Sequence, residues 1–177
     1  MVTPPAGSNM RTTSVQSEIR QSRPFRSRRQ EATIALLRTA SVVGRAIGRV
    51  LEPWNLSPAQ YNALRIIRGA ESAGIATLAI RERMIEEGTT ITRILDKLED
   101  SGFIRRERGP DRRQVICYAT ADGRRLLDKI DPLVDAADEQ AVASLPARDL
   151  PHFIAMLDSI RAANAERGAP RTMVRSR

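Results

Sequence analysis

The sequence predicts a mainly α-helical protein that carries one small β-hairpin. Apolar residues recur at three- and four-residue steps over most of residues 30–167, which is the pattern of buried helix faces. Two short β-prone runs interrupt this pattern between residues 103 and 120, on either side of a Gly-Pro-Asp turn. Five arginines fall in the nine positions from Arg105 to Arg113. The hairpin is therefore expected to concentrate positive charge.

Composition limits the class of protein. The 177 residues are 41% hydrophobic, which suffices for a folded domain with a core. With one cysteine and one histidine, we expect no intrachain disulfide, no metal site and no cofactor. Apolar runs stay well short of the ~18 residues of a membrane span, so no membrane association is expected. The chain is expected to be cytoplasmic.

The net charge of +8 comes from the two ends of the chain. Residues 1–29 hold six arginines and one glutamate, residues 168–177 hold three arginines, and residues 30–167 are balanced. The first 29 residues are rich in Ser, Thr, Pro and Arg, so we expect a disordered basic arm, and residues 168–177 a basic tail. The arm fits a solvated tail, a segment that follows DNA phosphates or, less well, a transit peptide. Overall basicity is therefore weak evidence for nucleic-acid binding.

Four helices are expected before the hairpin. The first covers residues 30–52 and ends before Pro53. The second begins with Ser57 as N-cap, Pro58 at its first position and Gln60 completing a capping box. Two shorter helices are expected over 77–85 and 89–101. Short consecutive helices of this kind are typical of helix-turn-helix units.

The helix at 89–101 has two different faces. Ile91, Ile94, Leu95 and Leu98 form one apolar face that must pack on the preceding helices. The other face presents small hydroxyls and then charged groups: Thr89, Thr90, Thr92, Arg93, Asp96 and Lys97. Small residues allow close approach to the major groove while Arg or Lys reaches bases or phosphates. The alternative for this helix alone is an ordinary solvated polar face.

The hairpin decides between these alternatives. Gly102 is expected to end the helix as a left-handed cap, FIRRER and QVICYAT read as strands, and Thr120 caps the next helix. Helices followed by such a hairpin form a winged helix-turn-helix over about 55–120. Its wing carries a net charge of +3 over nine residues, the local concentration that phosphate binding requires.

Two further helices are expected after the wing, over 120–144 and 146–167. Together with the helix at 30–52 they offer more apolar surface than a small winged domain covers. We therefore expect these three helices to form a dimerisation region within one domain at 30–167.

From about residue 30 to 165 the sequence resembles the multiple-antibiotic-resistance regulators, the MarR family. The likeness lies in LSPAQYNALRII, in ITRILDKLEDSGFIRRE and in DRRQVICYATADGRRLL. It implies a homodimeric, sequence-specific transcriptional regulator of the bacterial or archaeal cytoplasm, which we expect to be a repressor that binds a pseudo-palindromic site on double-stranded DNA. It also implies that Arg113 enters the minor groove, that Asp111 orients it, and that Arg108 and Arg112 contact phosphates.

The resemblance also raises the question of an effector, because members of the family often bind aromatic acids or drugs. Trp54, Tyr61 and Arg65 are the residues that we expect to line such a cleft, with core packing or surface charge as the alternative for each. Cys117, on the second wing strand, is expected to be a structural thiol.

Two other function classes fit the sequence less well. A winged helix can serve as a protein-interaction or dimerisation module without specific DNA binding, but arginines at the tip of the wing argue against this. An enzyme is not expected, and no catalytic residues are assigned, because the sequence has no phosphate-binding glycine loop and His152 is the only histidine available for a triad.

Overall fold

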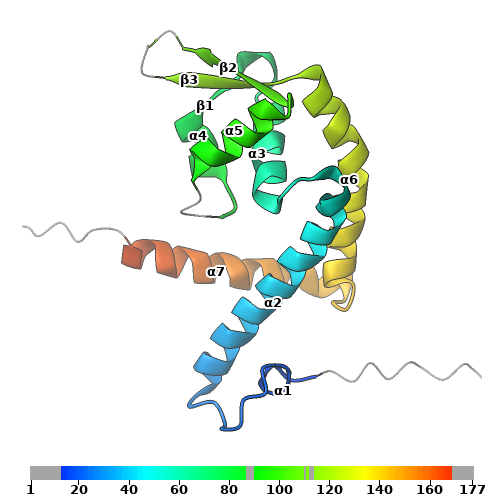
Figure 1. The fold of residues 1–177 in the computed structure, drawn as a ribbon. Helices are drawn as coiled ribbons and strands as arrows, with labels where there is room; N and C mark the ends of the chain where they lie inside the picture. Colours follow the sequence, from blue (N-terminus) through cyan, green and yellow to red (C-terminus); the bar gives the residue numbers. More distant parts are fainter. Residues whose placement is uncertain (1–12, 87–89, 110, 112–113, 169–177) are drawn as a thin grey trace, which may run out of the picture. The chain divides into compact units, whose positions relative to one another are not determined.

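The computed structural model describes residues 13–86, 90–109, 111 and 114–168. The chain divides into two compact units, Met1–Ala137 and Asp138–Arg177. The first unit holds the predicted winged helix-turn-helix, and its helices α3, α4 and α5 gather beside a small sheet (Figure 1). Its helices are α1 (Val15–Glu18), α2 (Arg28–Leu51), α3 (Pro58–Gly69), α4 (Thr77–Arg83), α5 (Ile91–Asp100) and most of α6 (Ala121–Val142).

The start of α3 follows from its local sequence. The Ser57 hydroxyl accepts the Gln60 backbone N–H at 3.2 Å, and the Gln60 side chain accepts the Ser57 backbone N–H at 2.8 Å. Pro58 occupies the first helical position. The predicted capping box is confirmed. Such a cap contributes about 1 kcal/mol, so α3 has a defined first residue independently of tertiary packing.

The sheet has three antiparallel strands in the order β1-β3-β2. The predicted hairpin is present as β2 (Ile104–Arg108) and β3 (Val115–Ala119), with Arg106 opposite Cys117. The two-residue strand β1 (Ile75–Ala76) was not predicted, and it pairs with the other side of β3. As a result β3 is central and β2 is an edge strand whose outer N–H groups need partners elsewhere.

The core of the first unit joins the helices to the sheet. Side chains that are fully or almost fully buried come from the end of α2, from α3, α4 and α5, from β3 and from α6: Leu51, Leu64, Ile67, Ile80, Leu95, Leu98, Cys117, Leu127 and Ile130. α6 therefore packs through its first half on the winged domain, and the domain's orientation on this helix is set by apolar burial.

Several predicted boundaries are wrong by a few residues. Residues 13–29 contain α1 and the first two residues of α2, although a disordered arm was expected there. α1 has Ser14 as its N-cap, and Glu18 forms an ion pair with Arg38 of α2 at 3.1 Å. α5 begins at Ile91 instead of residue 89. The Ser14 cap and the ion pair between Glu18 and Arg38, which are 20 residues apart in the sequence, account for the difference at α1. Sequence periodicity alone does not indicate either of them.

The second unit contains the end of α6, a 3-10 turn (η3, Ala147–Asp149) and α7 (Leu150–Gly168). The helix predicted to begin at residue 146 begins at Leu150, because Pro146 caps the 3-10 turn instead. Among its described side chains, Ile154, Met156 and Ile160 are 44–55% exposed.

Candidate nucleic-acid interface

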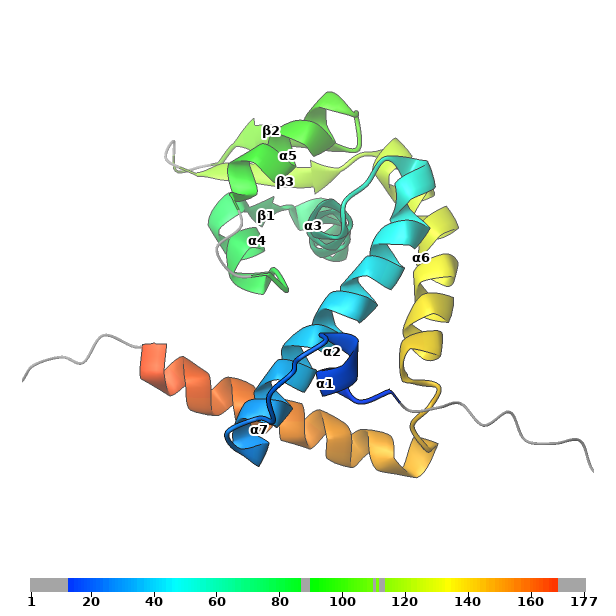
Figure 2. The ribbon, with the colours of Figure 1, turned by 60° about the horizontal axis from the view of Figure 1, so that its bottom comes forward.

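The helix α5 has one buried and one exposed face, as predicted. Ile94, Leu95 and Leu98 are buried at 7, 1 and 0% exposure. Thr92, Arg93 and Lys97 are exposed on the remaining surface. In Figure 2 this helix lies beside the hairpin, and α5 and β2 are in contact. Apolar packing therefore fixes the direction in which the polar side chains of α5 point.

Two threonines precede α5 in the sequence. Thr90 is exposed and occupies the N-cap position, but its side chain makes no capping hydrogen bond. Thr89 lies outside the described residues. The hydroxyl of Thr90 is thus not used to begin the helix.

The wing turn is closed by backbone hydrogen bonds. Gly109 donates to the carbonyl of Gln114 and Gln114 donates to that of Asp111, both at 2.9 Å. Arg108, the last residue of β2, is exposed and has no ion pair within the described part of the chain. Arg112 and Arg113 lie outside the described residues, so the proposed orientation of Arg113 by Asp111 stays a prediction.

Two of the wing arginines are paired within the protein. The Arg105 guanidinium lies over the Tyr118 ring, 4.1 Å from its centroid, and forms an ion pair with Glu107. Arg106 forms ion pairs with Asp96 and Glu99 of α5. The sequence-based count of five arginines therefore overstates the charge that the wing can offer to a phosphate backbone.

A Schellman motif sets the end of α5. Gly102 has a φ of 74° and donates to the carbonyl of Glu99 at 2.8 Å, and Phe103 donates to that of Leu98 at 2.9 Å. The predicted left-handed cap at Gly102 is confirmed. It turns the chain directly into β2, which brings the strand alongside the helix that precedes it.

Thr120 joins this turn to α6. Its hydroxyl donates to the Gly102 carbonyl at 2.7 Å and accepts the Gly123 N–H at 3.1 Å, while its backbone N–H donates to the Phe103 carbonyl at 3.0 Å. A Cβ on Gly123 would lie 2.1 Å from the Phe103 carbonyl oxygen. The Thr-x-x-Gly sequence therefore allows a close approach between the start of α6 and the end of α5.

Asp131 of α6 connects that helix to α3. It accepts the Tyr61 hydroxyl at 2.8 Å and pairs with Arg68 at 2.6 Å. Burial, and then the hydrogen bond to Asp131, raises the pKa of Tyr61 well above its ordinary value. Tyr61 is thus a core residue whose hydroxyl is used structurally.

Of the residues predicted for an effector cleft, Tyr61 lies in the core and Trp54 packs against it. Tyr61 is 5% exposed, Arg65 lies over its ring at 5.6 Å, and Trp54 packs against the core. None of the three lines the groove formed by α2, α3 and α5 or the smaller cavity beside α4. The contacts of Tyr61 and Trp54 are therefore those of core packing, the alternative to an effector cleft.

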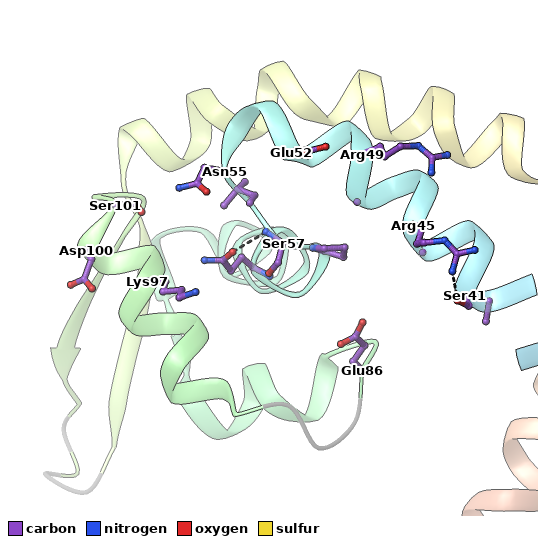
Figure 3. A pocket seen from close by; sticks show the side chains of 16 residues that line it. Ser41, Arg45, Arg49, Glu52, Asn55, Ser57, Glu86, Lys97, Asp100 and Ser101 are labelled. Atoms are coloured by element: carbon purple, nitrogen blue, oxygen red, sulfur yellow. Dashed lines mark hydrogen bonds between the residues drawn. The ribbon is translucent and has the colours of Figure 1, made fainter. Parts of the chain in front are cut away.

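A groove of about 1010 Å³ lies instead between α2 and the pair α3 and α5 (Figure 3). Its lining combines small residues of α2 with charged side chains of both signs: Ala40, Ser41, Gly44, Arg45, Gly48, Arg49, Glu52, Glu86, Lys97 and Asp100. Lys97 thus stands where the exposed face of α5 meets this groove.

Cys117 is fully buried at the centre of the sheet. Burial raises the pKa of its thiol, and the Thr77 hydroxyl lies 4.0 Å from its sulfur. A neutral, enclosed thiol is a poor nucleophile.

In the parts of the chain that are described, no three His, Cys, Asp or Glu side chains gather as a metal site. Of the helices described, none could cross a bilayer.

Three features of the site were not predicted: β1, the ion pairs of Arg106, and the close approach at Gly123. The signal for the second was available. Glu99 and Arg106 stand on either side of the predicted Gly102 cap, which folds the strand back along the helix. The other two depend on contacts between distant segments.

Comparison with known proteins agrees with this geometry. The MarR family model matches residues 56–115. A MarR transcription factor of known structure from Planctomyces limnophilus is 33% identical, with a TM-score of 0.60 over 76% of this chain and 98% of that one. The transcriptional regulator HosA of Escherichia coli O111:H- is 29% identical over 104 residues, 58% of this chain and 76% of HosA.

A mutant of MarR from Escherichia coli, solved in complex with operator DNA, has a TM-score of 0.65 over 71% of this chain and 90% of that one. At 23% identity it supports the fold alone. The similarity to the Planctomyces protein covers nearly all of that chain. The residues matched by the family model, 56–115, lie within the winged helix-turn-helix described above. The chain belongs to the MarR family of DNA-binding transcriptional regulators.

Proposed function

We propose that the protein is a homodimeric repressor that binds a pseudo-palindromic operator in the cytoplasm of a bacterium or archaeon. The observation that carries this is the two-faced helix α5, with Ile94, Leu95 and Leu98 buried and Thr92 and Arg93 exposed beside the wing. In this proposal α5 enters the major groove, where Thr90 and Thr92 permit close approach and Arg93 reaches a guanine edge or a phosphate. Thr89 and Lys97 extend the same contact surface.

The wing supplies the second contact. Arg108 and Arg112 would hold phosphates, and Arg113, oriented by Asp111, would enter a narrow minor groove, where the negative potential is strongest. Arg105 and Arg106 each form ion pairs with acidic residues of the protein, so the arginines that remain for DNA are those at and beyond the end of β2. This pairing supports the assignment of DNA contacts to Arg108, Arg112 and Arg113.

Exposed apolar side chains support a homodimer. Leu37 and Val42 of α2 are 66 and 43% exposed, and α7 contributes three more residues of this kind. Apolar surface repeated along helices is usually covered by a partner. A two-fold dimer would place two α5 helices on half-sites about one helical turn apart, roughly 10 bp.

A small aromatic or drug-like effector would act by preferring one arrangement of the dimer over another. The groove between α2 and α5 supports such a role better than the vicinity of Tyr61 does, because its volume suits a drug-sized ligand. An effector seated there would contact both the winged domain and the helix proposed for dimerisation.

The proposal is tested by fluorescence anisotropy with an operator selected from random duplexes and an unrelated duplex of the same length. Arg93→Ala is expected to weaken operator binding by about ten- to a hundredfold if it contacts a base. Arg113→Ala is expected to weaken it while the dimer stays folded.

Arg125→Ala is the matched control, because it removes the same charge from the exposed surface of α6. Equal losses for Arg93→Ala and Arg125→Ala would show that only overall charge matters and would contradict the assigned interface. Repression is tested separately, with a reporter gene placed behind the selected operator.

A further inference from the structure

Arg106 and two acidic residues of α5 form a cluster that we call the helix–wing clamp: Arg106, Asp96 and Glu99. Arg106 donates through Nε to Glu99 Oε2 at 2.8 Å, and its Nη2 lies 2.5 Å from the same oxygen and 2.8 Å from Asp96 Oδ1. The side chain of Arg106 is only 25% exposed. A guanidinium held by two carboxylates in this way is not available to a phosphate.

Glu99 also contacts the backbone of the wing. Its Oε1 accepts the backbone N–H of Arg106 at 3.0 Å. β2 is the edge strand of the sheet, so this N–H has no strand partner on that side. One carboxylate therefore binds both the side chain and the main chain of the same strand residue, which fixes the strand against the helix in position and in register.

The ionisation of the pair agrees with this geometry. The hydrogen bond from Arg106 lowers the pKa of Glu99, and the hydrogen bond to Glu99 raises the pKa of Arg106. Both groups thus stay charged at neutral pH. The clamp holds two carboxylates and one guanidinium, so it places net negative charge on a surface that is proposed to approach DNA.

We propose that Glu99 is a positioning residue for DNA recognition: by holding Arg106 it fixes the wing relative to α5, and operator specificity depends on this fixed angle. The inference rests on the proposed function. α5 and the wing would contact different grooves of one half-site, so both can bind together only at one relative orientation. Non-specific binding, which depends on total charge, does not need that orientation.

This leads to an expectation opposite to that of simple electrostatics. Removing an acidic residue from a DNA-binding surface normally strengthens binding, because one repulsion is lost. If the clamp positions the wing, Glu99→Gln should instead weaken operator binding about tenfold, the effect of losing a charged hydrogen bond. Binding to an unrelated duplex should be unchanged or tighter, so the ratio of the two dissociation constants falls.

The experiment compares wild type, Glu99→Gln and Asp100→Asn on the operator and on the unrelated duplex at two salt concentrations. Asp100→Asn is the matched control, because it removes the same charge from the adjacent position of α5, outside the clamp. It should leave the operator preference unchanged.

A structural readout accompanies the binding data. Hydrogen exchange of the Arg106 amide in the free protein should be faster in Glu99→Ala than in wild type, while the thermal midpoints establish that the variants are folded. The positioning role is overturned if folded Glu99→Gln keeps the full operator preference. If wild type itself does not distinguish the operator from the unrelated duplex, the proposed function fails, and the positioning role fails with it.

Discussion

Replacing Gly123 with alanine is expected to destabilise the protein, although the same change usually stabilises a helix. Gly123 lies in the first turn of α6, and alanine is favoured over glycine by about 1 kcal/mol in helices. Its hydrogen-bonded neighbour Thr120 fixes this turn against the chain that follows α5. Tertiary contact should therefore outweigh helix propensity at this position.

The magnitude follows from the distances around the missing Cβ. An added Cβ would lie 2.1 Å from the carbonyl oxygen of Phe103 and 3.3 Å from Cδ1 of Leu64. The carbonyl cannot move aside freely, because it accepts the Thr120 N–H at 3.0 Å. α6 must shift instead, and overpacking of this kind costs about 1–3 kcal/mol.

The assay is equilibrium urea unfolding at one fixed protein concentration, followed by circular dichroism and by the fluorescence of Trp54, the only tryptophan. Gly44→Ala is the matched control, since Gly44 also lies in a helix and, among the described residues, nothing beyond its neighbours in that helix lies within 4 Å of its added Cβ. This variant is expected to gain up to about 1 kcal/mol. A Gly123→Ala protein as stable as Gly44→Ala would refute the close approach at Phe103.

Three other predictions test separate parts of the structure. Ser57→Ala should lower the free energy of unfolding by about 1 kcal/mol, measured by urea unfolding, because it removes the capping box of α3. The Cys117 thiol should react with a disulfide reagent only after opening of the fold, and native reaction as fast as in denaturant would contradict its burial. Because the folded-state pKa of Tyr61 is raised, wild type should lose stability as the pH rises above about 10, the pKa of an unfolded tyrosine. Tyr61→Phe should lose less over the same range, and equal losses would show that this tyrosine does not titrate on unfolding.

The features that the sequence predicted correctly are those encoded within a few residues. The capping box needs only Ser57 and Gln60, three positions apart, and the Schellman motif needs only Gly102 after an apolar helix. The hairpin was predicted from two β-prone runs and a turn. Local chemistry was sufficient in each case.

The features that were missed depend on partners in other elements of the fold, although the pairing of Arg106 with Glu99 had a local signal in the Gly102 cap between them. β1 has only two residues and exists because Ile75 pairs with Cys117. The count of wing charges was misleading because Arg106 is held by acids on the preceding helix. The effector residues were placed by their position near a helix junction, but the burial of Tyr61 and its bond to Asp131 could be seen only in three dimensions.

The most direct test of the central claim is selection of binding sites from random duplexes by the purified protein, with the enriched sequences measured again at two salt concentrations. If the protein is a homodimeric regulator, we expect an enriched inverted repeat whose half-sites are centred roughly 10 bp apart. We also expect its affinity for the operator to exceed its non-specific affinity by at least about a thousandfold. Salt-sensitive binding without any enriched sequence would contradict sequence-specific recognition by α5 and the wing.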